Sequence, residues 1–181
     1  MSYLSNPKID NYATDGLLGV SNSLAYRVHE IEKHFHSEEH WYGTDGDGTG
    51  STANNLDVWT TTAGTGEAYG AEVQLLGAND ISNSDFSFTP VKFDAHSILV
   101  TTANQTDDLY MIQIWSGTGT FGEATLISEF PYYVASAFTE SGIIRIQMPR
   151  QAVATKLWAR CKCTANGGTI SFIIGVHAYV G

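Results

Sequence analysis

Apolar and polar residues alternate with a period of two along the C-terminal part of the chain. Between residues 156 and 163, Leu157, Ala159, Cys161 and Cys163 alternate with Trp158, Arg160 and Lys162. Residues 144–148 repeat the pattern, with Ile144, Ile146 and Met148 separated by Arg145 and Gln147. Because successive side chains of a strand point to opposite faces, both segments are predicted to be strands of an antiparallel sheet that packs one face on a core.

Strand-like segments separated by turn signals fill the predicted domain, residues 56–181. Their ranges are 58–62, 70–76, 85–89, 91–93, 97–101, 109–116, 124–130, 142–148, 156–163 and 169–180. The most definite turn is Asn166-Gly167-Gly168, a hairpin between the last two strands. Short strands around one core, without helical patterns between them, predict an all-β antiparallel β-sandwich. The strand count best matches an eight-stranded jelly roll, with an up-and-down barrel as the alternative.

A helical spacing occurs in residues 22–40. Leu24, Val28, Ile31 and Phe35 recur at intervals of four, three and four, and Asn22 or Ser23 precedes them as an N-cap. This predicts a short amphipathic helix with a narrow apolar seam, which would be marginal alone in water. Two supports remain open: copies of the same helix around a symmetry axis, which would make a trimer interface, or the side of its own domain.

Two irregular segments flank this helix. Residues 1–21 hold isolated apolar side chains without a sustained period, and we interpret them as an extended arm that a partner surface orders. The apolar residues of this arm are Tyr3, Leu4, Ile9, Tyr12, Leu17 and Leu18. Residues 41–55 are rich in Gly, Asp, Ser, Thr and Asn, and they are predicted to be a linker between helix and sandwich.

Charge is distributed unevenly. The 181 residues carry a formal net charge of −10, so the chain has no electrostatic reason to bind nucleic acid or an anionic membrane. All nineteen acidic residues lie at or before Glu140, whereas the last 41 residues hold five of the nine basic ones. Pairing of these basic side chains within the chain is the simpler expectation. A second subunit or another protein is the alternative partner.

Two cysteines, Cys161 and Cys163, would project from the same face of one strand. Their α-carbons would lie about 6.6 Å apart with parallel side chains, which strains a disulfide. We therefore expect two buried thiols in a reducing compartment. The first residues lack a signal-peptide pattern and no apolar run is long enough to span a membrane, so synthesis in a cytoplasm is expected.

Potential metal ligands concentrate near residue 40. The segment His36-Ser37-Glu38-Glu39-His40 matches H-x-x-E-H, in which two histidines one helical turn apart bind zinc and the glutamate acts as general base. A zinc hydrolase using His36, Glu39 and His40 is therefore one hypothesis. The segment ends a helix before a Gly-rich linker, without a cleft or a third ligand, so a solvated polar helix end is favoured. His96 and His177 lie in the β domain, and neither is beside a nucleophile motif. We expect no enzyme activity and no cofactor.

Four tryptophans are spread along the chain: Trp41, Trp59, Trp115 and Trp158. An exposed row of them would suit a carbohydrate-binding adhesion module that recognises host or environmental glycans, although packing in core and interfaces is favoured. Trp158 alternates onto the same face as Arg160 and Lys162, and an aromatic beside cations is typical of protein interfaces. These three residues are the predicted subunit contact within the sandwich.

Several segments resemble tailed-bacteriophage virion proteins of the head-decoration or head-fibre type. The segments are residues 23–36, Val91-Lys92-Phe93-Asp94-Ala95-His96, residues 156–163 and the closing Gly175-Val176-His177-Ala178-Tyr179-Val180-Gly181. The resemblance implies a homotrimeric, jelly-roll-like sandwich on the exterior of a capsid, attached to the major capsid protein by its N-terminal segment. A structural protein of the virion that decorates or stabilises the head is therefore the leading functional hypothesis.

Overall fold

Two antiparallel sheets form the body of the protein in a computed structural model that describes residues 38–44, 51–53, 57–81, 85–87, 89–135 and 142–179. The first sheet has the order β2-β1-β11-β5-β8, with β3 also pairing with β11 and β9 with β5. Its strands are β1 (Glu38–Thr44), β2 (Ser51–Ala53), β3 (Trp59–Thr62), β5 (Lys92–Ala103), β8 (Gly142–Arg145), β9 (Gln151–Ala152) and β11 (Thr169–Tyr179).

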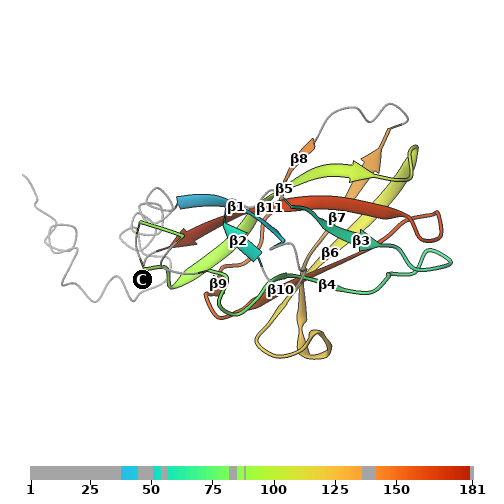
Figure 1. Ribbon diagram of the computed structural model, residues 1–181. Coiled ribbons are helices and arrows are strands. Elements are labelled where there is room, and N and C mark those ends of the chain that lie inside the picture. Colours follow the sequence, from blue (N-terminus) through green and yellow to red (C-terminus); the bar gives the residue numbers. More distant parts are fainter. Residues whose placement is uncertain are drawn as a thin grey trace, which may run out of the picture.

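The second sheet has the order β4-β10-β6-β7. Its strands are β4 (Val73–Leu76), β6 (Asp108–Gly117), β7 (Thr125–Val134) and β10 (Lys156–Lys162), and the 3-10 turn η2 (Phe121–Glu123) lies in the loop between β6 and β7. The two sheets stack as the layers of a sandwich (Figure 1).

Strand pairing is nested. The first long strand pairs with the last (β1 with β11), β4 pairs with β10, β5 with β8 and β6 with β7. This is the pairing produced when one long antiparallel hairpin is rolled into two sheets, which defines a jelly roll. The prediction of an all-β antiparallel sandwich is confirmed.

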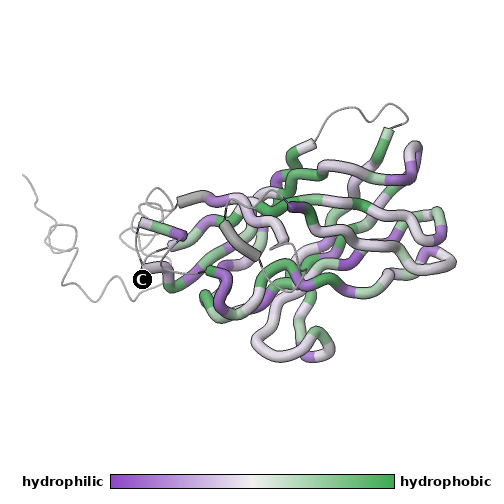
Figure 2. Tube along the Cα trace, viewed as in Figure 1, coloured by the Kyte–Doolittle hydropathy of each residue, from purple (hydrophilic) through white to green (hydrophobic). Residues whose placement is uncertain are grey.

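The core lies between the sheets. Its largest fully buried side chains include Tyr110, Ile112 and Ile114 of β6, which belong to one hydrophobic cluster with Phe172 and other residues of β11. Figure 2 shows hydrophobic and hydrophilic positions alternating along many of the strands, as expected where one face of each strand is buried. The alternation predicted for residues 156–163 is correct: Leu157, Ala159, Cys161 and Cys163 all belong to the core.

Most predicted strands are present, with three main differences. The strand predicted at 142–148 ends at Arg145 as β8, so the alternation of Ile146 and Met148 continues outside regular strand structure although both side chains are buried. Segments 91–93 and 97–101 are one continuous strand, β5, because polar Asp94 and His96 project from its outer face rather than marking a break. The predicted strand at 85–89 is wrong, since residues 85–87 form a turn. There the Tyr42 hydroxyl donates to Asp85 Oδ2 at 3.4 Å.

The predicted helix 22–40 and linker 41–55 are wrong where the structure describes them. Glu38–Thr44 is strand β1, paired with residues 174–178 of β11, and Ser51–Ala53 is strand β2. The physical reason is the fully buried Tyr42, whose place in the core and long pairing with β11 override local composition. Residues 1–37 lie outside the described part, including the predicted arm and the helix seam of Leu24, Val28, Ile31 and Phe35.

The hairpin between β10 and β11 lies where the sequence predicts it. Gly167 has a positive φ of 67°, the left-handed conformation that glycine adopts without steric cost. Among the described residues, no helix has the length and apolar character needed to cross a bilayer.

Candidate functional site

Three potential metal ligands converge on the outer face of the first sheet. Asp94 and His96 belong to β5, two residues apart, so both project away from the core. His177 lies on β11 directly opposite Asp94 in the strand register. The pairing register shifts between Gly175 and Val176, and the bulge there accommodates the extra residue His96 on β5. The three side chains are thus placed together by backbone pairing between segments about eighty residues apart in sequence.

The geometry of this cluster is tight. The rings of His96 and His177 stack with centroids 3.7 Å apart and an interplanar angle of 7°. His177 Nδ1 lies 3.9 Å from Asp94 Oδ1, and one ligand atom from each of the three residues lies within 4.8 Å of the others. All three residues are half-buried. Asp94 Oδ1, both ring nitrogens of His96 and His177 Nδ1 have almost no contact with solvent in this arrangement.

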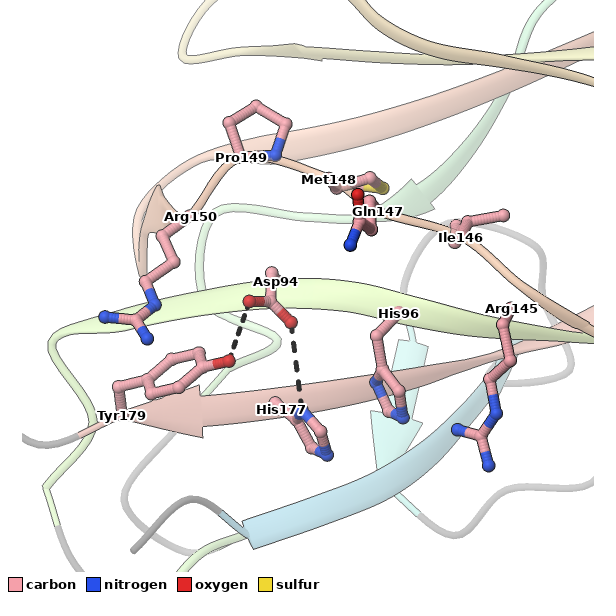
Figure 3. Close-up of a pocket in the computed structure, with 10 residues that line it drawn as sticks. All are labelled: Asp94, His96, Arg145, Ile146, Gln147, Met148, Pro149, Arg150, His177 and Tyr179. Atoms are coloured by element: carbon pink, nitrogen blue, oxygen red, sulfur yellow. Dashed lines mark hydrogen bonds and ion pairs between the residues drawn. The ribbon is translucent and has the colours of Figure 1, made fainter. Parts of the chain in front are cut away.

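Tyr179 fixes the carboxylate from the other side. Its hydroxyl donates to Asp94 Oδ2 at 2.7 Å, and the Arg150 guanidinium lies 4.0 Å from the centroid of its ring. Burial, followed by the hydrogen bond to Asp94, raises the pKa of Tyr179, so the hydroxyl keeps its proton and remains a donor. Asp94 therefore has one oxygen held by Tyr179 and the other directed toward His177 (Figure 3).

The cluster forms the floor of a cleft of about 700 Å³. The segment Ile146–Arg150, which joins β8 to β9, borders the cleft opposite the cluster (Figure 3). Arg145 lines the end near His96, and its guanidinium donates to Ser97 Oγ at 2.7 Å. Arg150 lies at the other end, over Tyr179. Two imidazoles and one carboxylate are a donor set that suits a divalent transition metal, and the two guanidiniums at the rim suit an anionic group beside it.

The predicted subunit contact of Trp158, Arg160 and Lys162 lies on the outer face of the second sheet, opposite the core thiols, as its alternation indicates. Trp158, however, is only 5 % exposed, because the β6–β7 loop folds back and places Phe121 against it at 6.2 Å between centroids. The indole therefore offers little surface to a partner. The sequence pattern gave the face correctly but could not show that the chain covers it.

Arg160 and Lys162 also contact their own chain. Arg160 Nε donates to Gln113 Oε1 at 2.8 Å, and its guanidinium lies 4.8 Å from the ring centroids of both Tyr69 and Trp115. Lys162 lies 5.1 Å from the Tyr69 ring centroid. These contacts lie within the chain, but they are to an amide and to aromatic rings rather than to the acidic neighbours that the simpler interpretation of the basic C-terminal segment expects.

The H-x-x-E-H segment does not form a helical zinc motif at its described end. Residues Glu38 to His40 belong to β1, and the His40 ring packs edge-on against Phe86 at 4.8 Å. His36 lies outside the described residues. Because histidines one helical turn apart require a helix through both, the helical placement of this motif is wrong at His40.

The tryptophans do not form an exposed row. Trp59 and Trp158 are buried, whereas Trp41 and Trp115 are half-buried. Cys161 and Cys163 are free and buried, which confirms the prediction of two buried thiols, and burial raises the pKa of Cys161 to about 11. Neither thiol is therefore poised as a nucleophile at neutral pH.

No protein-family model matches the chain, and no curated protein matches it either. The Asp94–His96–His177 cluster was not predicted as a site from the sequence. The sequence shows His96 and His177 only as two isolated histidines in the β domain. Their proximity depends on the register of β5 against β11, which no local pattern encodes.

Proposed function

We propose that the protein is a structural component of a virion, which attaches to the exterior of a capsid as a homotrimer and decorates or stabilises the head. The observation that supports self-association best is an apolar row across the outer face of the first sheet. Ile173, Leu99 and Ile143 are direct neighbours on β11, β5 and β8. They lie on the face opposite the core.

The row becomes more exposed toward the sheet edge. Ile173 is 5 % exposed, Leu99 is half-buried and Ile143 is 57 % exposed. Fully burying an isoleucine side chain is worth about 1.5–3 kcal/mol, so covering this edge with a second subunit is favourable. We therefore place the subunit contact on this face rather than around Trp158, whose surroundings already cover it.

The arm predicted in residues 1–21 would contact the major capsid protein, as the resemblance to head-decoration proteins implies. Leu24, Val28, Ile31 and Phe35 of the predicted helix would face one another in the trimer. A rigid jelly roll without an exposed aromatic row among its described residues suits a structural part better than a glycan-binding one. The function needs no catalysis: the sandwich presents a surface, and the N-terminal segment attaches it.

Light scattering of the purified full-length chain tests the oligomeric state. The wild type should have a trimer mass at micromolar concentration, and Ile143→Asp should shift it toward the monomer because a carboxylate would be buried in the contact. Leu109→Asp is the matched control, since Leu109 is 44 % exposed on the outer face of the second sheet. A monomeric wild type, or equal dissociation by both variants, would contradict the proposed contact.

Attachment is tested separately by sedimentation. The tagged protein should co-sediment with assembled virions and remain bound after dilution. A version lacking residues 1–37 should stay in the supernatant while its circular dichroism remains that of a β protein. Protein found only in the soluble fraction of an infected lysate would overturn the virion assignment.

A further inference from the structure

We propose that Asp94, His96 and His177 bind a divalent transition-metal ion of the zinc or nickel class on the outer face of the first sheet. The three ligand atoms come from two adjacent strands and already lie within 4.8 Å of one another. Zinc–nitrogen bonds of about 2.0–2.1 Å place ligand atoms of a tetrahedral site about 3.3 Å apart. Side-chain movements of one to two ångströms therefore close the site without moving the strands.

One oxygen of the Asp94 carboxylate lacks a hydrogen-bond donor among the described residues. Tyr179 occupies Oδ2 of Asp94, whereas Oδ1 is buried and accepts no hydrogen bond from any described residue. Its nearest cationic candidate is His177 Nδ1 at 3.9 Å, which is too far for a hydrogen bond. A buried carboxylate oxygen without a donor is costly, and a metal ion in the space between Asp94 and His177 would satisfy it.

The donor set selects the class of metal. Imidazole nitrogens favour zinc, nickel, copper and iron, whereas calcium and magnesium require six or more oxygen ligands. One carboxylate and two imidazoles cannot supply that number. Since the rings of His96 and His177 are stacked in this structure, binding requires one or both rings to turn so that a nitrogen lone pair of each points at the ion.

Tyr179 acts as a positioning residue in this site. Its hydrogen bond holds Asp94 in place, and outer-shell bonds of this kind change metal affinity by about 10–100-fold when they are removed. The fourth ligand would enter from the cleft, which Arg145 and Arg150 also line, so their positive charge would favour an anionic oxygen ligand on the metal.

Isothermal titration of the metal-free full-length protein with Zn²⁺ and with Ni²⁺ tests the site. The wild type should bind about one ion per chain in addition to any ions held by the N-terminal histidines. Asp94→Asn, which preserves shape and the Tyr179 contact, should weaken this binding at least tenfold. His177→Phe and His96→Phe should do the same while retaining an aromatic ring, and Tyr179→Phe should have a smaller effect in the same direction.

The matched control is the double variant His36→Ala/His40→Ala, which removes the histidines of the H-x-x-E-H segment and leaves the cluster intact. This variant should retain the ion that Asp94→Asn loses. Circular dichroism of each variant shows that it is folded, and Ca²⁺ should give no comparable heat with any of them.

Three results would overturn the site. These are no binding by the folded wild type, binding that Asp94→Asn leaves unchanged, and binding that is lost only when His36 and His40 are replaced. Titration measures the metal site and light scattering measures the subunit contact, so failure of metal binding leaves the proposed virion function standing, and the reverse also holds.

Discussion

The outer faces of the two sheets are built from similar residue types but in opposite ways. On the second sheet the polar groups satisfy one another: Gln113 accepts from Arg160 and Trp115, and it donates to Glu129, which also accepts from Tyr69 at 2.6 Å. These hydrogen bonds from Tyr69 and Gln113 lower the pKa of Glu129, so it remains a carboxylate well into the acid range.

On the first sheet the outer face is left incomplete. It holds an apolar row that ends in exposed Ile143 and a buried Asp94 oxygen without a hydrogen-bond donor among the described residues. Composition alone therefore does not locate a binding face. The basic and aromatic strand β10 looks like an interface in the sequence, yet its own chain covers Trp158 and leaves Arg160 and Lys162 only half-exposed. The less conspicuous strands β5 and β8 retain groups that a partner or an ion could satisfy.

Trp158→Ala should have the largest effect on stability, because it empties the space beneath Phe121 on the covered face. Loss of a buried tryptophan costs about 3–5 kcal/mol. Urea unfolding followed by circular dichroism measures the change. A loss below about 1 kcal/mol would show that the loop over Trp158 opens in solution. The outer face of the second sheet would then be as uncovered as that of the first.

Asp108→Ala should have the next largest effect. The Asp108 side chain accepts from Thr164 Oγ1 at 2.6 Å and from the backbone N–H groups of Leu109 and Ala165, and removing it leaves these donors unpaired. We expect a loss of about 2 kcal/mol at pH 7 in urea unfolding. The same change at Asp107, whose carboxylate accepts a long 3.4 Å bond from Tyr133, should cost much less.

Lowering the pH should reduce the difference in unfolding free energy between the wild type and Asp108→Ala. Burial opposes ionisation of Asp108, but the hydrogen bonds from Thr164, Ala165 and Leu109 outweigh it and lower its pKa. A lowered pKa in the folded state adds stability above the unfolded-state value of about 3.9, and that stability is lost as the pH falls through the folded-state pKa. The urea midpoints of both proteins, measured between pH 7 and pH 3, test this expectation. A gap between the two midpoints that widens as the pH falls would contradict the lowered pKa of Asp108.

Arg160→Met should have a smaller effect than either of these changes. Methionine keeps much of the apolar stem but loses the hydrogen bond to Gln113 and the contacts with the Tyr69 and Trp115 rings. We expect a loss of about 1 kcal/mol, and a shift in tryptophan fluorescence because Trp115 loses its cationic neighbour. If instead the oligomeric mass fell, Arg160 would belong to a subunit contact after all.

Ile143→Ala should have the smallest effect on the stability of the isolated subunit. At 57 % exposure, Ile143 contributes little to the folded monomer, so the change should stay within about 0.5 kcal/mol under conditions in which light scattering shows a monomer. Under associating conditions the same variant should weaken the oligomer. A large loss of monomer stability would mean that this edge is already packed, and the contrast between the two faces would disappear.

The sequence predicts the strands correctly where one face of the strand is buried and the other face is exposed to solvent. In β10 the core set Leu157, Ala159 and Cys161 alternates with polar or covered positions, and the glycine turn that follows fixes the hairpin. The pattern fails in β11, where nearly every residue is buried on both faces, so the strand is evident but its register is not.

The candidate site could not be predicted for the same reason. His177 is one of few polar residues in β11, and its meaning depends on Asp94 lying opposite and on a bulge that brings His96 beside it. The end of the predicted helix was wrong for a related cause: β1 exists because it pairs with β11 more than 130 positions later, and local spacing carries no information about that partner.

The pairing of the first strand with the last also determines how the sandwich bears load. Glu38 enters opposite Ala178, so both ends of the described sandwich lie at one end of the same strand pair, about 30 Å from the turn at Gly167. Force applied between those two ends would open the β1–β11 hydrogen bonds one after another, like a zipper. Force applied between residue 38 and the distant Gly167 turn would load the same bonds together in shear, and the sandwich should resist it far longer.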